Sequence, residues 1–364
     1  MRAAVLEELG QKVVVCDDLD VQAPRAGEVA VDVKHCGLCH SDLSIIDGVF
    51  PSGTPVVLGH EAAGIVAEVG AGVSSLKPGD HVVLTPTPSC GTCFHCVRDE
   101  ASNCSNTASI MTGLLPDGTT PLSRQGAPVF RGVGVGAFAE RVITPETGAV
   151  RIDDDIPLDV ACVVGCAVQT GTGAALNAAG VRSGDTVLVL GLGGVGLSAV
   201  QGARVAGAAR ILVSDPVASR REAALAMGAT DLLDPASDDI VAAAQAINGV
   251  GVDFAFETAG KGSLIDVGLQ SVRNGGTVVC VGAPALDETF TLIPAAFVMS
   301  GKKIVSTVLG NANSLRDIPR YLSLWKSGRL DLESLITNRR PIAEINEACE
   351  DLRAGRGIRT VLDF

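Results

Sequence analysis

The stretch 185–206, DTVLVLGLGGVGLSAVQGARVA, decides the fold of one part of this chain. It begins as a continuous apolar run typical of a buried parallel strand and ends with the composition of a helix. Between the two stands a Gly-x-Gly-x-x-Gly turn made by Gly191, Gly193 and Gly196. These glycines permit a tight turn, a close backbone approach to a pyrophosphate and close helix–strand packing. We therefore predict a dinucleotide site at the N-terminus of this helix.

An acidic residue follows at the spacing that such a site requires. Asp215 ends the next predicted strand, 19 residues after Gly196. A carboxylate there accepts hydrogen bonds from the ribose hydroxyls of adenosine and repels a 2′-phosphate, which favours NAD over NADP. Arg220 and Arg221 are close enough in sequence to contact the same ribose. The alternative interpretation is a surface aspartate that caps the turn before Pro216.

Strand and helix patterns continue on the C-terminal side of this stretch. Apolar runs at 211–214, 252–256 and 277–281 alternate with Ala-rich segments, as in a doubly wound parallel sheet. Before about residue 165 the chain instead has short β runs broken by Gly and Pro, and residues 105–136 are expected to form one long loop. Near the end, an amphipathic helix is expected around 318–325, and 359–362 is expected to return as a strand to the first domain.

Composition limits the class of protein. The 364 residues, 47% of them hydrophobic, are enough for two domains with buried cores. The net charge of -13, without a basic cluster, makes nucleic acid a poor partner. No signal-peptide pattern and no run of about 18 apolar residues is found, so we expect a cytoplasmic protein that does not enter a membrane.

Four cysteines have the spacing of a metal site. Cys90, Cys93, Cys96 and Cys104 can surround a tetrahedral ion, and four thiolates leave no position for water. The sequence therefore predicts a structural zinc. Four independent buried cysteines are the alternative, but the segment is polar and interrupted by glycine. His95 lies inside the loop and is expected to face solvent.

A second set of potential ligands is dispersed along the chain. Cys39 stands in the segment CHSD, His60 in GHE and Cys166 in VGC. Their spacing alone identifies nothing, because each could equally be a buried thiol or a core histidine.

Taken together, these segments resemble the zinc-dependent medium-chain alcohol dehydrogenases over the whole chain. The resemblance is carried by Gly59-His60-Glu61-x2-Gly64-x5-Gly70-x2-Val73, with the CHSD segment, the four cysteines and the dinucleotide turn. It implies an α/β fold in which residues 1–167 and 308–364 form a GroES-like, β-rich catalytic domain. A doubly wound Rossmann domain for NAD, residues 168–307, is inserted between them. The implied reaction is a reversible hydride transfer between an alcohol and NAD.

The resemblance gives the dispersed residues a role. It implies that Cys39, His60 and Cys166 hold a catalytic zinc, which makes two Zn²⁺ per chain. Asp42 would orient His60, and Ser41 would take the proton of the alcohol.

Further contacts follow from the same resemblance. Glu61 would lie near the metal and assist ligand exchange. Residues expected to contact the cofactor, besides the three glycines of the turn and Asp215, are His40, Thr170, Gly194, Val195, Arg220, Val281 and Arg359.

Two departures from the family pattern bear on the substrate. Ser44 stands where many relatives carry a histidine that passes the proton to solvent, and Pro86 replaces a bulky aromatic residue. The second change predicts a wider pocket and a bulky apolar or aromatic alcohol. Residues 215–222 are similar to those of actinobacterial relatives, some of which retain their cofactor and use an artificial acceptor. The expected pocket lining is Phe50, Pro86, Ile110, Ala283 and Leu309.

Two other functions remain open from the residues. A biosynthetic carbonyl or iminium reductase could use the same scaffold, and a non-catalytic NAD-binding redox sensor could retain the fold. The family also implies a homodimer formed through edge strands of the cofactor domains, for which 297–299 with 303–305 is the candidate edge.

Overall fold

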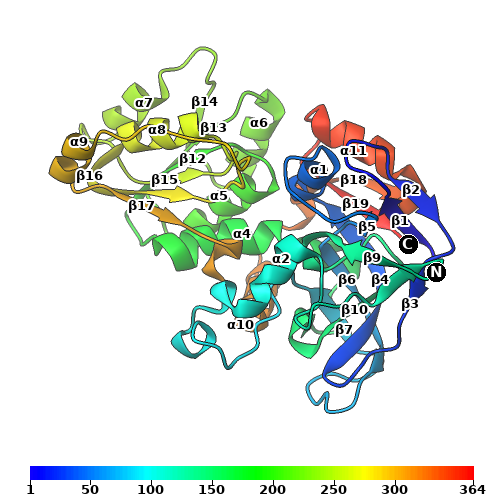
Figure 1. Cartoon of the computed structure of the whole chain (residues 1–364). Coiled ribbons are helices and arrows are strands. Elements are labelled where there is room, and N and C mark those ends of the chain that lie inside the picture. Colours follow the sequence, from blue (N-terminus) through cyan, green and yellow to red (C-terminus); the bar gives the residue numbers. More distant parts are fainter. The chain divides into compact units, whose positions relative to one another are not determined.

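The computed structural model describes all 364 residues and divides into two compact units (Figure 1). The first unit consists of Met1–Ala167, Asn313–Leu324 and Ile336–Phe364, and the second of Val168–Ala312 and Trp325–Leu335. The division differs from the expected one near the C-terminus, because residues 308–312 and 325–335 pack with the second unit rather than the first.

Specific contacts explain this difference. The side chain of Gln201 donates to the carbonyl of Asp331 at 2.9 Å and accepts from its N–H at 2.6 Å. Arg204 donates to the carbonyl of Arg329 at 2.8 Å. Gly310 packs so tightly on Gly173 that a Cβ at Gly173 would lie 2.6 Å from its carbonyl oxygen. These contacts join segments far apart in sequence, so the local pattern could not predict them.

The first unit is built on two β-sheets that enclose a core of Val, Leu, Ile and Ala side chains. The central strand of one sheet is β4 (Glu28–Leu38), which is buried over most of its length and pairs antiparallel with three others. This sheet has the order β11 (Ala149–Arg151), β7 (His81–Leu84), β6 (Glu61–Val69), β4, β19 (Arg359–Asp363), β18 (Ile336–Pro341), with β10 (Arg141–Pro145) also on β4. The other has the order β2 (Val14–Cys16), β1 (Ala3–Leu6), β5 (Val56–Val57), β9 (Ala127–Arg131), β8 (Leu122–Arg124), β3 (Asp20–Val21).

Residues 105–136, expected as one loop, carry regular structure. They contain the helix α2 (Ser109–Thr112) and the antiparallel hairpin β8–β9. The hairpin turns through Gln125 and Gly126, whose φ angles of 52° and 79° are both left-handed, as a two-residue primed turn requires. Glutamine is not a usual residue at that position, so no local pattern indicated a hairpin here.

The second unit confirms the predicted doubly wound sheet. Its strands are all parallel, and β12 (Thr186–Leu190) lies at its centre between β13 (Arg210–Ser214) and β15 (Val252–Glu257). The order continues outward to β14 (Asp231–Leu233) on one side and to β16 (Val272–Cys280) and the edge strand β17 (Lys303–Ser306) on the other. Its helices are α5 (Gly194–Ala206), α6 (Ala218–Ala226), α7 (Ile240–Ala246), α8 (Gly262–Ser271) and α9 (Pro294–Ser300).

The C-terminal segment matches two expectations. The amphipathic helix is α10 (Ser314–Lys326), and β19 returns to pair with β4 in the first unit. The remaining helices are α1 (His40–Ile46), α3 (Leu158–Ala161), α4 (Ala167–Gly173) and α11 (Ile345–Arg353). No single helix has the length and hydrophobicity of a membrane span, although the bent pair Leu158–Gly165 and Ala167–Ala179 does when its two parts are taken together.

Candidate active site

The chain between β4 and α1 presents a cysteine that is held by a buried carboxylate. Cys39 directly follows β4 and is the N-cap of α1. Asp42, in the first turn, accepts from the N–H of Cys39 at 3.0 Å and from that of Gly59 at 2.9 Å. Its Oδ1 also lies 3.2 Å from Nδ1 of His60. Asp42 and His60 are fully buried, so this carboxylate fixes both the cysteine and the orientation of the imidazole.

The structure brings the dispersed residues into one buried cluster. The ligand atoms of Cys39, His60, Glu61 and Cys166 all lie within 4.8 Å of one another. Because Nδ1 of His60 faces Asp42, its Nε2 is left in the cluster, where it has no hydrogen-bond partner. A buried ring nitrogen among two thiols and a carboxylate is the donor set that zinc takes. These residues therefore fit the metal ion that the resemblance implies.

Both oxygens of the Glu61 carboxylate have a partner. Its Oε1 accepts from the N–H of Ala167 at 3.1 Å, and its Oε2 lies 3.4 Å from Nε of Arg359. Burial raises the pKa of Glu61 to about 7, against the lowering effect of Arg359. The fit is close, because a Cβ at Gly37 would lie 2.5 Å from the Glu61 carboxylate.

Arg359 is buried beside Glu61, a contact that the sequence did not predict, while its expected contact with the cofactor stays a prediction. Expected at the cofactor pyrophosphate, it is 5% exposed in the structure and also donates to the carbonyl of Leu38 at 2.7 Å. Burial alone would lower the pKa of Arg359, but the charges of Glu61 and the thiols of Cys39 and Cys166 hold it above its usual value. The guanidinium thus balances negative charge beside the cluster of potential metal ligands, and no sequence signal indicates this.

The four predicted cysteines form a second cluster. The sulfur atoms of Cys90, Cys93, Cys96 and Cys104 lie within 4.8 Å of one another. Backbone N–H groups point at them: Cys93 N donates to Cys90 Sγ and Cys90 N to Cys104 Sγ, both at 3.3 Å. Hydrogen bonds of this kind favour thiolates, and those from the backbone N–H groups of Cys96 and Ser105 lower the pKa of Cys93 to about 5. His95 instead turns to Glu100 at 2.8 Å and is outside the cluster.

Two glycines of the turn in the second unit have different surroundings. A Cβ at Gly196 would lie 1.9 Å from the carbonyl oxygen of Gly191, so any other residue at this position would clash with the backbone. A Cβ at Gly193 would meet nothing within 4 Å. Since Gly193 is the N-cap of α5, its open surface leaves room for a phosphate at the helix N-terminus.

Asp215 lies beside this turn. Its Oδ2 accepts from the N–H of Leu192 at 2.7 Å and its Oδ1 from that of Val217 at 2.8 Å. The carboxylate is 5% exposed and is therefore held in one orientation at the end of β13. Arg220 Nη1 lies 4.0 Å from Oδ2 of Asp215.

The remaining predicted residues fall in both units. In the first, Ser41 Oγ lies 3.8 Å from Cys39 Sγ, and His40 beside it is exposed. The expected pocket residues of this unit are the half-buried Phe50 and Ile110 and the buried Pro86. In the second unit, the expected pocket residue Leu309 is buried and Ala283 is exposed. Of the residues expected to contact the cofactor there, Thr170 and Gly194 are buried, and Val195 and Val281 are half-buried.

Comparisons with known proteins agree with this arrangement. Residues 25–154 match the family model of the alcohol dehydrogenase GroES-like domain, and residues 194–326 match that of zinc-binding dehydrogenases. The chain is 40% identical to an NDMA-dependent alcohol dehydrogenase of Amycolatopsis methanolica over 99% of this chain and 98% of that one. It is 39% identical, with the same coverage, to a putative alcohol dehydrogenase D of Mycobacterium tuberculosis.

A solved structure supports the same assignment. Benzyl alcohol dehydrogenase from Acinetobacter calcoaceticus matches with a TM-score of 0.94 and 32% identity, over 100% of this chain and 99% of that one. The relatives and the solved structure match over nearly the full length, and the two family models match one segment each. The chain belongs to the zinc-binding alcohol dehydrogenase family.

Proposed function

We propose that this alcohol dehydrogenase oxidises bulky apolar or aromatic alcohols to carbonyl compounds, with two bound zinc ions and NAD as hydride acceptor. The buried donor set of Cys39, His60 and Cys166 carries the proposal, because an open three-ligand site suits metal catalysis. The four-cysteine cluster would hold the other zinc, which has no open position and only stabilises its lobe.

The residues of the donor set prepare it for a metal. Asp42 holds His60 through Nδ1 and so directs Nε2 inward. Arg359 and the N–H of Ala167 hold Glu61, which keeps the fourth position open for the substrate oxygen. A zinc ion bound there would act as a Lewis acid and lower the pKa of the alcohol.

Ser41 is the proposed first acceptor of the alcohol proton. It stands in the first turn of α1, and its Oγ is 3.8 Å from Cys39 Sγ, so it is next to the metal cluster. Ser44, one turn further along the same helix, has no imidazole, so the proton must leave through hydroxyl groups or water.

For the cofactor we propose NAD at the glycine turn, where it would accept the hydride. Gly193 leaves space at the N-terminus of α5, and the fixed carboxylate of Asp215 would bind the ribose hydroxyls and repel a 2′-phosphate. The A. methanolica relative is named for its dependence on NDMA. We therefore propose that NDMA can also serve as the final acceptor here while the dinucleotide stays bound.

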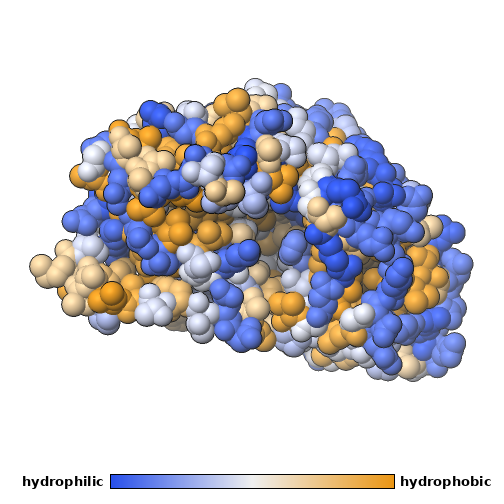
Figure 2. All heavy atoms as spheres, turned by 90° about the horizontal axis from the view of Figure 1, so that it is seen from above, coloured by the Kyte–Doolittle hydropathy of each residue, from blue (hydrophilic) through white to orange (hydrophobic).

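The assembly we propose is a homodimer in the cytoplasm. The edge strand β17 has one side unpaired, and α9 beside it exposes Val298 by 75% and Met299 by 85%. Figure 2 shows apolar atoms gathered at this end of the second unit. A second copy that pairs with β17 would cover both the strand edge and this patch.

Steady-state rates test the reaction. Benzylic alcohols, terpenoid alcohols and ethanol are compared with NAD, and separately with NDMA without added NAD. We expect a bulky alcohol to have a kcat/KM at least ten-fold above that of ethanol; preference for ethanol would contradict the wide pocket. Ser41→Ala should lower kcat by about 100-fold or more with metal content unchanged, and Ser41→Thr should retain activity.

A further inference from the structure

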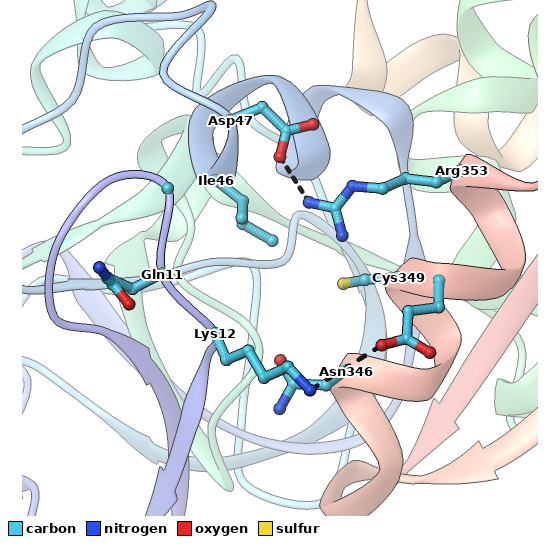
Figure 3. A pocket seen from close by; sticks show the side chains of 9 residues that line it. Gln11, Lys12, Ile46, Asp47, Asn346, Cys349 and Arg353 are labelled. Carbon is cyan, nitrogen blue, oxygen red and sulfur yellow. Dashed lines mark hydrogen bonds and ion pairs between the residues drawn. The ribbon is translucent and has the colours of Figure 1, made fainter.

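A cavity of about 290 Å³ lies in the first unit at the end of α1 that is opposite to Cys39. Three segments far apart in the sequence surround it: the loop before β2, the last residues of α1, and one face of α11 (Figure 3). No lining residue belongs to either cysteine cluster or to the glycine turn. The cavity is therefore distinct from the active site.

Hydrogen bonds fix its walls to one another. The N–H of Gly10 donates to the carbonyl of Ile46 at 2.5 Å, which joins the loop to α1. The side chain of Asn346 accepts from Val13 N at 3.0 Å and donates to Val13 O at 2.9 Å, which joins the end of the loop before β2 to α11. The segments that form the walls are thus held together before any ligand arrives, so binding has to order mainly the side chains of the rim.

The rim carries two cations and two carboxylates. Arg353 Nη2 donates to Asp47 Oδ1 at 2.5 Å, and Figure 3 shows the other terminal nitrogen of Arg353 directed into the cavity. Lys12 Nζ is 3.9 Å from Glu350 Oε1, which is too far for a hydrogen bond. Both members of this second pair therefore keep hydrogen-bonding capacity for a ligand.

The floor is apolar. Ile46 and Cys349 are 5% and 2% exposed and belong to the hydrophobic core of the unit. Figure 3 shows the sulfur of Cys349 facing the cavity. An apolar floor beneath a rim with charges of both signs is suited to a ligand that has an apolar body and two opposite charges.

We propose that this cavity is a binding site for a small zwitterion, an α-amino acid with a short apolar side chain. Its carboxylate would bind Arg353 and Lys12, its ammonium would bind Glu350 and Asp47, and its side chain would cover the floor. A simple anion would face the two carboxylates, and a simple amine the two cations, so neither matches the rim. The existing ion pairs oppose binding only weakly, since all four side chains are 41–80% exposed.

The position of the cavity gives the site a regulatory role. Helix α1 runs from the cavity residue Ile46 back to His40, and the cluster residues Cys39 and Asp42 stand at its first turn. Seven residues of helix span only about 10 Å. A ligand that holds the end of α1 would restrain the helix that carries Ser41. This second part of the proposal depends on the proposed alcohol oxidation.

Calorimetric titration of the full-length protein with L-leucine tests the site. Two control ligands each carry one of its charges. Isocaproate carries only the carboxylate, and isopentylamine carries only the ammonium group. We expect L-leucine to bind saturably and each analogue to bind about ten-fold more weakly or worse, because charge-assisted hydrogen bonds are lost. Absence of saturable leucine binding, or equal binding of either analogue, would overturn the site.

Variants test which residues bind. Arg353→Gln and Glu350→Gln should each weaken leucine binding about ten-fold. Arg356→Gln is the control, because Arg356 pairs with Asp351 outside the cavity. Equal losses in all three variants would overturn the assignment.

Kinetics test the coupling to α1. L-leucine at a concentration near its wild-type Kd should change kcat/KM for alcohol oxidation in the wild type, and Arg353→Gln should need about ten-fold more L-leucine for the same change. Binding without any kinetic change would overturn the regulatory part and support the site alone. Calorimetry needs no turnover, so a failure of the proposed reaction would be seen separately.

Discussion

Replacing Asp42 by asparagine tests how the proposed zinc ligands Cys39 and His60 are held in place. Asp42 is fully buried and accepts from the N–H groups of Cys39 and Gly59 and from Nδ1 of His60. An asparagine of the same shape has one acceptor oxygen. With that oxygen facing Gly59 and His60, its NH₂ group must face the N–H of Cys39, so two donors oppose each other.

The expected magnitude follows from these contacts. One hydrogen bond to a charged acceptor is lost and two others become bonds to a neutral acceptor, which gives a destabilisation of about 3–4 kcal/mol. Because His60 is then held by a neutral acceptor instead of a carboxylate, zinc affinity should fall about 10- to 100-fold.

Two measurements check this prediction. Denaturant unfolding of metal-stripped protein gives the free energy of unfolding, and competition with a chelator gives the zinc affinity. Asp47→Asn, at the other end of the same helix, is the matched control; this half-exposed ion pair should be worth less than about 1 kcal/mol. If Asp42→Asn binds zinc as tightly as the wild type, the proposed orientation of His60 is wrong.

Three further predictions concern other parts of the molecule. In metal-stripped protein, burial raises the pKa of Glu61 from 4.5 to about 7. The folded state therefore retains a proton that the unfolded chain releases, and the free energy of unfolding should fall as pH rises through this range. Glu61→Gln should remove this pH dependence from denaturation midpoints measured at several pH values. Gly196→Ala should lower the melting temperature strongly, because its Cβ would meet Gly191 O at 1.9 Å. Gly193→Ala should leave the melting temperature unchanged and weaken NAD binding in calorimetry. Equal melting temperatures of both variants would refute this difference between the two glycines. Asp215→Asn should reduce the preference for NAD over NADP in kinetic assays and stay folded. Asp215→Ala should also destabilise the folded protein, because two buried N–H groups lose their acceptor. An unchanged preference would mean that another group binds the ribose.

Local patterns were enough to predict the parallel sheet of the second unit. The apolar run of β12, the glycine turn and the start of α5 are contiguous, and their geometry depends on neighbouring residues. Gly196 illustrates this, because its partner Gly191 is only five positions away. The spacing of Cys90, Cys93, Cys96 and Cys104 was sufficient for the same reason, since one loop brings all four together.

Other features depend on residues that are distant in sequence. Cys39, His60 and Cys166 form one cluster only after β4, β6 and the segment before α4 have packed, so their spacing alone could not identify it. The placement of Arg359 behind Glu61, separated by almost 300 positions, has no local signal. The hairpin at Gln125 was missed because the left-handed turn lacks its usual residues.

Metal content of the purified protein tests the central claim most directly. Elemental analysis of the wild type, Cys166→Ser and the control Cys162→Ser, each with circular dichroism to verify folding, separates the two clusters. Cys162 is also buried but is outside the ligand set. We predict two zinc ions per chain in the wild type and in Cys162→Ser, and one in folded, inactive Cys166→Ser. One zinc in the wild type, or two in Cys166→Ser, would contradict a catalytic zinc at Cys39, His60 and Cys166.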